Sequence, residues 1–214
     1  MQALIISMMN KFGYLGILLL IAIENVFPPI PSEVILGFGG FMTTYTKLNI
    51  VGVIIFATLG SVIGAIILYL IGKILNRERL AKIVRGKIGK ILFLKEEDIE
   101  KAYGWFDKRG YKTVFFCRFV PIVRSLISIP AGMSEMKMPK FLAYTTIGSL
   151  IWNTVLVCIG ATLGDNWEKL VLVMDEYSTI ALVLIIILFI VIVFMFYKNK
   201  IKQMKIEKTN SKKN

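Results

Sequence analysis

The feature that most constrains how this chain can fold is a run of twenty uncharged residues at 178–197, STIALVLIIILFIVIVFMFY. A helix needs roughly 20 apolar residues to cross the hydrocarbon core of a bilayer. The chain has 214 residues and is 56% hydrophobic, whereas about 45–50% is usual for a soluble domain. We therefore predict an all-α integral membrane protein whose last, C-terminal transmembrane helix is 178–197.

Two other apolar segments, 50–72 and 140–163, are each long enough for a complete membrane span. Two further apolar segments, 12–46 and 113–134, are interrupted by prolines, which cannot continue a helix. Short apolar limbs joined by a proline-containing break are typical of re-entrant helical hairpins, which require protein or a wet cavity around them. The residues expected at the two hairpin apices are Pro28, Pro29, Pro31, Pro121, Pro130 and Gly132.

The charged residues are confined mainly to the polar segments between the apolar ones. Segment 73–112 holds twelve basic and six acidic residues, and the tail 198–214 holds seven lysines and one glutamate. Segment 164–177 holds four acidic residues and one lysine. Since loops rich in Lys and Arg stay in the cytoplasm, we expect one polytopic domain over 1–197. Its amphipathic loop 73–112 and its basic tail 198–214 are predicted to be cytoplasmic, and 164–177 to lie outside.

The net charge of +12 would suggest a nucleic-acid partner in a soluble protein. Here the segregation of charge is explained better by membrane topology and by anionic lipid headgroups. The sequence contains no aromatic-interleaved basic motif of the kind that binds nucleic acid. We therefore expect membrane lipids as partners and no nucleic acid.

The two proline-interrupted segments resemble each other. PPIPSEVILGFGG at 28–40 aligns with VPIVRSLISIPAG at 120–132, and each is followed by a polar link and a full span in which Gly72 aligns with Gly160. The topology predicted from charge makes the two halves enter the membrane from opposite sides. We interpret this as an inverted repeat of a hairpin plus a transmembrane helix, which points to a transport site at the bilayer midplane. Chance similarity within membrane sequence is the alternative.

Four ionisable residues lie within the hairpin segments: Glu24, Glu33, Arg118 and Arg124. A charge at the bilayer centre costs about 2.5–3.5 kcal/mol on insertion scales, so each needs a partner or a role. One hypothesis is that carboxylates and guanidiniums pair only to hold the hairpins together. The other is a functional site, in which the two arginines bind a phosphate headgroup bidentately and the two glutamates exchange a proton.

Histidine is absent from the sequence, and the two cysteines, Cys117 and Cys158, lie in apolar surroundings that suit buried small side chains. No histidine-based metal site or histidine-assisted nucleophile can therefore be built. We expect no cofactor, no metal and no enzymatic activity, with a lipid phosphatase as the enzymatic alternative.

The charged and proline motifs resemble those of the DedA family of membrane proteins. The motifs that carry the resemblance are Glu24-x6-Pro31-Ser32-Glu33, Phe116-x-Arg118-Phe-Val-Pro121-x-x-Arg124, Pro130-Ala-Gly132, Phe141 and Gly148 with Trp152-Asn153. The family usually has glycine where this chain has Ser32 and Ile122. The resemblance implies two facing re-entrant hairpins and lipid movement across the membrane, with Glu24 and Glu33 as the family's acidic residues and Arg118 and Arg124 as its arginines.

From the residues and the resemblance together we expect a transporter in a bacterial cell membrane. It would move a lipid phosphate, most specifically undecaprenyl phosphate, between leaflets, with protons as a second partner. The alternatives are a phosphatidylethanolamine flippase or scramblase and a membrane factor for envelope assembly that transports nothing. A homo-oligomer is compatible with the sequence.

Overall fold

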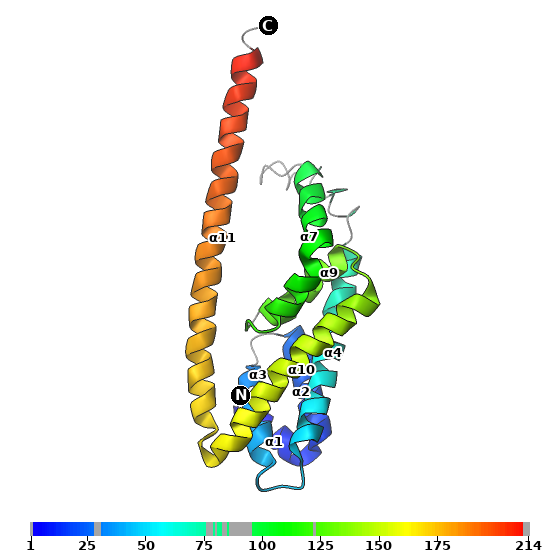
Figure 1. Ribbon diagram of the computed structural model, residues 1–214, viewed down its shortest axis with the longest axis vertical. Helices are drawn as coiled ribbons and strands as arrows, with labels where there is room; N and C mark the ends of the chain where they lie inside the picture. The colour runs from blue at the N-terminus through cyan, green and yellow to red at the C-terminus, as the bar shows by residue number, and fades with distance from the viewer. Residues whose placement is uncertain are drawn as a thin grey trace. The chain divides into compact units, whose positions relative to one another are not determined.

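The computed structural model describes residues 2–27, 31–75, 96–121 and 123–211, together with residues 79, 81–82 and 85. Every regular element in these ranges is a helix (Figure 1). In chain order the elements are α1 (Gln2–Phe12), α2 (Tyr14–Val26), α3 (Ser32–Met42), α4 (Ile50–Ile74), α7 (Glu96–Cys117), α8 (Val123–Leu126), α9 (Ser128–Met133), α10 (Met138–Leu163), η1 (Gly164–Asn166) and α11 (Glu168–Ser211).

Three of the described helical stretches are long and apolar enough to cross a membrane, namely Ile50–Ile74, Met138–Asn166 and Glu168–Leu188. The first two coincide with the spans predicted at 50–72 and 140–163. The all-α class predicted from the sequence is confirmed.

The structure differs from the sequence interpretation at 164–177, where we expected an acidic loop. Only the 3-10 turn Gly164–Asn166 and Trp167 separate α10 from α11, which begins at Glu168. Residues 168–177 contain neither glycine nor proline, so the last span extends toward its N-terminus without a break. The chain forms two compact units, residues 1–174 and 175–214.

A second difference concerns residue 112, where we predicted the boundary between the polar loop and the second hairpin. Helix α7 runs without interruption from Glu96 to Cys117, so it joins the polar loop to the apolar segment. One helix can belong to both segments because its polar residues come first along the sequence and its apolar residues follow. The segment between Leu75 and α7, including most of 73–95, lies largely outside the described residues.

Helix α4 is the element on which the first unit is assembled, and α2 runs parallel to it. At the start of both helices the Asn49 N–H donates a hydrogen bond of 2.8 Å to the Tyr14 hydroxyl. At the end of α2, Asn25 lies against Gly64, near the middle of α4. After α2 the chain must therefore run back toward the end at which α2 and α4 begin, and α3 is the helix that runs back.

Helix α10 runs antiparallel to α4. The ring of Phe141, near the start of α10, lies 4.8 Å from the ring of Tyr69, near the end of α4. Asn153, farther along α10, is hydrogen-bonded to Thr58 and Ser61 of α4. The two long helices therefore meet along much of their length, and Figure 1 shows α7 and α9 toward one end of α4 and α1 toward the other.

Glycines bring α3 and α10 into backbone contact. A Cβ added at Gly40 would overlap the Val157 carbonyl oxygen, and one added at Gly160 would overlap the Gly37 carbonyl oxygen. Small residues allow helices to approach closely in lipid, where dispersion contacts replace the hydrophobic effect as the driving force. The close contact between α3 and α10 thus requires glycine on both helices.

Glycines also bring α9 and α4 into backbone contact. A Cβ at Gly132 would overlap the Tyr69 carbonyl oxygen, and one at Gly72 would overlap the Ile129 carbonyl oxygen. Helices α3 and α9 are therefore each packed against a long helix by a reciprocal pair of glycines.

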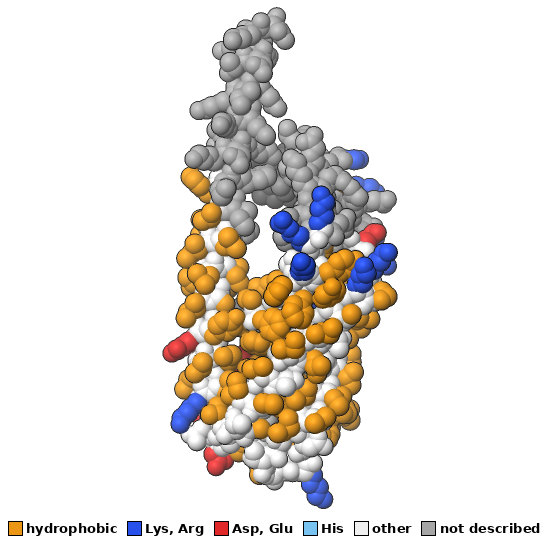
Figure 2. Space-filling model, in the orientation of Figure 1, with side chains coloured by type: hydrophobic (Ala, Val, Ile, Leu, Met, Phe, Trp, Pro, Cys, Tyr) orange, Lys and Arg blue, Asp and Glu red, His pale blue; other side chains and the backbone are white. Residues whose placement is uncertain are grey.

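Two hydrophobic clusters fill the first unit. One surrounds Ile17, Ile35 and Val157 and reaches Trp167 and Leu170 at the start of α11. The other surrounds Val114, Ala131 and Phe141. Figure 2 shows apolar side chains over most of the visible face of this unit, with Lys and Arg side chains gathered toward its α7 end. An apolar belt with charges beyond it is the surface expected of a protein that sits in a bilayer.

Replacing Gly132 with alanine should weaken the contact between α9 and α4. The added methyl group meets a backbone oxygen that cannot rotate away, and overpacking of this kind costs about 1–3 kcal/mol. Thermal unfolding of the purified variant in detergent should therefore occur at a lower temperature than for the unsubstituted protein.

Gly104→Ala is the matched control, because no heavy atom lies within 4 Å of a Cβ at Gly104. Its unfolding temperature should stay the same or rise, since alanine favours a helix over glycine by about 1 kcal/mol. Equal effects from the two substitutions would contradict the packing described here.

Candidate functional site

The four ionisable residues singled out in the sequence lie next to the breaks between helices. Glu24 is in the last turn of α2, and Glu33 is in the first turn of α3. Arg118 directly follows α7, and Arg124 is in the four-residue helix α8. All four side chains are buried, with exposed fractions between 2% and 8%. The breaks in the two apolar segments thus bring charged side chains into the protein interior.

An ion pair joins the two broken segments. The Nη2 atom of Arg124 lies 2.6 Å from Oε2 of Glu24. The next residue on each segment repeats the link, because the Ser125 hydroxyl donates a hydrogen bond of 3.0 Å to Oδ1 of Asn25. Two consecutive residue pairs, 24 with 124 and 25 with 125, therefore fasten α2 to α8.

This link lies near the middle of α4. Asn25 donates through Nδ2 to the carbonyl oxygen of Ser61 at 3.3 Å, and Ser61 is close to the midpoint of the 25-residue helix α4. If α4 spans the membrane, the ion pair lies far from both aqueous faces. At that depth unpaired charge is expensive, which favours the pairing observed.

A buried polar network extends from this point to α10. Asn153 donates through Nδ2 to the Thr58 hydroxyl at 3.2 Å and to the Ser61 hydroxyl at 3.4 Å. Asn153 and Ser61 are both at least 95% buried. Helices α2, α4, α8 and α10 are therefore linked through polar side chains at one level of the structure.

Arg118 is held separately from the Glu24–Arg124 ion pair. Its Nη2 atom donates hydrogen bonds of 3.0 Å to the hydroxyls of Ser128 and Thr145, and its stem packs against Gly148. Its Nε atom is buried and has no hydrogen-bond partner among the residues that the structure describes. Neutral hydroxyls leave the charge of Arg118 uncompensated by direct contact, so this guanidinium retains the capacity to bind an anionic oxygen.

Glu33 completes the charge balance of the site without forming an ion pair within the described part of the chain. It is 92% buried and lies within electrostatic range of both Arg124 and Glu24. The hydroxyl of its neighbour Ser32 is also buried and has no partner in the described part of the chain. Two carboxylates and two guanidiniums thus cancel in formal charge, while only one pair is in direct contact.

The structure places the expected apical residues in different ways. Pro31 immediately precedes α3, and Pro121 is buried between α7 and α8. Pro130 and Gly132, however, lie within α9 and not at the break. Pro130 is in the first turn of α9, where the missing N–H has no helical acceptor to lose. Pro28 and Pro29 lie outside the described residues.

The sequence reasoning missed the neutral polar residues of the site, although several were visible as isolated polar residues in apolar segments. The residues concerned are Asn25, Ser61, Ser125, Ser128 and Thr145, and Asn153 had been noted only as part of the motif Trp152-Asn153. Such residues are common in membrane helices for packing alone, so their position in one network became evident only from the structure.

Comparison with known proteins places the chain in a family. The family model described as the VTT domain matches residues 30–162, which include Glu33, both arginines and the two long helices α4 and α10. The chain belongs to the VTT-domain, or DedA, family. The resemblance noted in the sequence is thereby confirmed.

Several members of the VTT-domain family are similar over most of their length. An "Alkaline phosphatase-like protein" of Lactococcus lactis subsp. lactis (strain IL1403) is 60% identical over 94% of each chain. "Undecaprenyl phosphate transporter A" of Staphylococcus aureus is 41% identical over 86% of this chain and 90% of its own. The protein of the same name in Bacillus subtilis is 35% identical over 84% and 86% of the two chains. No solved structure matches this member of the VTT-domain family.

These relatives and the apolar helices together identify the chain as a multi-pass membrane protein. The names of these relatives point in two directions, to lipid phosphate transport and to a phosphatase-like activity. Within the described residues no three His, Cys, Asp or Glu side chains are grouped so as to hold a metal ion.

Removing one partner of the Glu24–Arg124 ion pair should destabilise the protein strongly. Glu24→Gln leaves the Arg124 guanidinium buried without its counterion, and breaking a buried pair in this way costs about 3–5 kcal/mol. The double variant Glu24→Leu/Arg124→Met should recover most of the loss, because apolar groups of similar volume replace both charges.

Thermal unfolding of the single and double variants in detergent gives the coupling between the two positions. Glu168→Gln, at an exposed site in the first turn of α11, controls for the same change in net charge. If the double variant lost as much stability as the two single variants added together, the two residues would not be energetically coupled.

Proposed function

We propose that this protein carries a lipid phosphate between the two leaflets of the membrane and that Arg118 and Arg124 bind its phosphate group. The observation that carries the proposal is a pair of buried arginines, of which Arg118, held against α10, has an Nε donor without a hydrogen-bond partner among the described residues. Arginine presents its donors in a planar fork that suits phosphate oxygens. The names of the Staphylococcus aureus and Bacillus subtilis relatives favour undecaprenyl phosphate as the lipid.

The architecture that we propose is an inverted repeat of a re-entrant hairpin and a transmembrane helix. In the first half, the hydrogen bond between Tyr14 and Asn49 supports a hairpin whose two ends both lie at the start of α4. In the second half, the Tyr69 hydroxyl donates to the Met136 carbonyl oxygen at 2.6 Å, and the ring of Tyr111 stacks on that of Tyr144 at 5.9 Å. These contacts support entry and exit at the opposite end of α4.

The reciprocal glycine pairs support the same proposal. Gly40 and Gly160 join the limb of the first half to the long helix of the second, whereas Gly132 and Gly72 join the limb of the second half to the long helix of the first. The sequence alignment of the two halves pairs Gly40 with Gly132 and Gly72 with Gly160. Equivalent positions thus make equivalent contacts across the two halves, as an inverted repeat requires.

The mechanism follows from where polar groups are available. Only the phosphate must leave water, because the hydrocarbon chain of the lipid can stay in the bilayer throughout. A phosphate that reaches Arg118 meets a guanidinium whose other contacts are neutral hydroxyls. To reach Arg124 it must displace Glu24, so binding of phosphate and the Glu24–Arg124 ion pair are mutually exclusive at that position.

This competition suggests a role for protons. A carboxylate displaced from its counterion at this depth is costly unless it takes up a proton. Glu24 and the nearby Glu33 are therefore the groups that we propose to gain a proton as phosphate binds and to lose it as phosphate leaves. The cytoplasmic position of the tail and of 73–112 stays a prediction.

Transport of undecaprenyl phosphate by purified protein in liposomes should depend on the arginine fork. Arg124→Lys keeps the charge but loses bidentate contact, and hydrogen bonds to charged groups contribute about 1.5–3 kcal/mol. We expect the transport efficiency of Arg124→Lys to fall by about tenfold or more, measured as the rate at which labelled lipid becomes accessible in the opposite leaflet. Arg79→Lys, at an exposed position outside both the buried charges and α7, is the matched control and should retain most of the activity.

The competing functions give different results in the same liposomes. A phosphatidylethanolamine flippase would move that lipid with little sensitivity to Arg124→Lys, since the amine is recognised by carboxylates. A phosphatase, as the Lactococcus name suggests, would release inorganic phosphate from the labelled lipid. An assembly factor would move neither lipid, and that result would refute the proposed transport.

Proton coupling predicts that the rate of transport changes when a pH gradient is imposed on the liposomes. Glu33→Gln should weaken the response to the gradient while exchange without a gradient continues, because glutamine cannot exchange a proton and only Glu24 is left to do so. Glu168→Gln, at an exposed site in the first turn of α11, should behave as the unsubstituted protein. Transport that is indifferent to the gradient would rule out coupling and leave the carrier function standing.

A further inference from the structure

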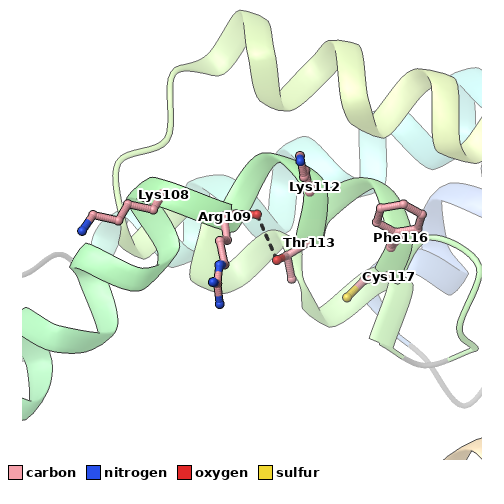
Figure 3. Close-up of a pocket in the computed structure, with 6 residues that line it drawn as sticks. All are labelled: Lys108, Arg109, Lys112, Thr113, Phe116 and Cys117. Atoms are coloured by element: carbon pink, nitrogen blue, oxygen red, sulfur yellow. Dashed lines mark hydrogen bonds between the residues drawn. The ribbon is translucent and has the colours of Figure 1, made fainter.

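A pocket of about 550 Å³ lies along α7, and the residues that line it do not include the four buried charged residues. Figure 3 shows its lining side chains along this helix, with two cationic residues toward one end and an aromatic ring and a thiol toward the other. The lining residues are Lys108, Arg109, Lys112, Thr113, Phe116 and Cys117. They are spaced three or four residues apart on successive turns, so they share one face of the helix.

The polar end of the pocket offers only positive charge. Lys108, Arg109 and Lys112 are exposed, and none forms an ion pair with an acidic side chain in the described part of the chain. Thr113 donates its hydroxyl to the Arg109 carbonyl oxygen at 3.0 Å, so it is committed to the helix backbone. The long, flexible stems of the cationic residues allow their heads to gather around an anion.

The other end of the pocket is apolar and open. The Phe116 side chain is 63% exposed, and Cys117 is half-buried. An exposed aromatic ring one turn beyond a basic cluster is suited to the boundary between headgroups and hydrocarbon, where one end of a ligand is charged and the other is apolar.

The pocket leads toward the buried arginine of the transport site. Arg118 follows Cys117 directly, so one helix carries the exposed cations at one point and a buried guanidinium at its end. From Lys108 to Arg118 the axial distance is about 15 Å at 1.5 Å per residue. That distance is comparable with half the thickness of a bilayer's hydrocarbon core, about 30 Å in all.

We propose that this pocket is the docking site at which the transported lipid phosphate first binds, with its phosphate on Lys108, Arg109 and Lys112 and the start of its chain over Phe116. The proposal rests on the carrier function above and names the step that precedes contact with Arg118. The positive charge together with the adjoining apolar surface favours a lipid phosphate over free inorganic phosphate, which has no apolar part to contact Phe116.

Cys117 provides a direct readout of occupancy. In a Cys158→Ala background it is the single thiol of the chain, and its alkylation by N-ethylmaleimide can be followed by mass spectrometry of the protein in phosphatidylcholine liposomes. Undecaprenyl phosphate should slow the alkylation at least fivefold, whereas undecaprenol, which lacks the phosphate, should not. Phosphatidylglycerol at the same mole fraction should protect less than undecaprenyl phosphate.

The triple variant Lys108→Gln/Arg109→Gln/Lys112→Gln tests the cations. It should require about tenfold or more undecaprenyl phosphate for half-maximal protection, since each basic residue near the surface adds to the attraction for an anionic headgroup. The matched control Lys47→Gln/Lys73→Gln/Lys137→Gln removes the same charge from exposed positions outside the pocket and should keep full protection. Equal alkylation rates without lipid show that the variants are folded alike.

Each result separates the docking site from the carrier function. Equal protection by undecaprenol or by phosphatidylglycerol would overturn the docking proposal, as would protection that survives in the pocket variant. Arg124→Lys should lose transport and keep protection, because Arg124 is not in the pocket. Protection without transport by the unsubstituted protein would leave the docking site standing and refute the carrier, whereas transport without protection would do the reverse.

Discussion

The contact between Glu24 and Arg124 is the interaction on which the interior of this protein depends. Burying either charge alone beside the middle of α4 would cost too much free energy, because neither lipid nor the surrounding side chains can solvate an isolated charge. Together with the Asn25–Ser125 bond beside it, the ion pair fixes the end of α2 against α8. The two broken segments must therefore fold together, since each supplies the counterion of the other.

Close packing of backbones works alongside this polar link. The reciprocal glycine pairs set α3 against α10 and α9 against α4, and they leave the polar side chains of α2, α8 and α10 facing one another. Dispersion contacts hold the limbs in place, so the ion pair is not the only attachment. A carrier of the kind proposed needs this division of labour, because the Glu24–Arg124 contact must open for phosphate while the helices remain packed.

Much of this arrangement could be predicted from the sequence because charge and proline are conspicuous in apolar surroundings. The long helices, the breaks and the four ionisable residues were all evident from composition along the chain. The pairing of Glu24 with Arg124, and not with Arg118, depends on side-chain positions across helices that no local pattern encodes. The prediction of a loop at 164–177 was wrong because acidity indicates the side of the membrane and not the secondary structure. The placement of Pro130 and Gly132 at an apex overlooked that a helix accepts proline in its first turn.

The unbroken course of α7 has a mechanical consequence. A helix without glycine or proline between Tyr111 and Cys117 is stiff over the turns that separate the basic pocket from Arg118. A tilt of this segment would therefore shift the buried guanidinium relative to Ser128 and Thr145, whose hydroxyls belong to other helices. The orientation of the turn that carries Lys112 is thus coupled to the position of Arg118.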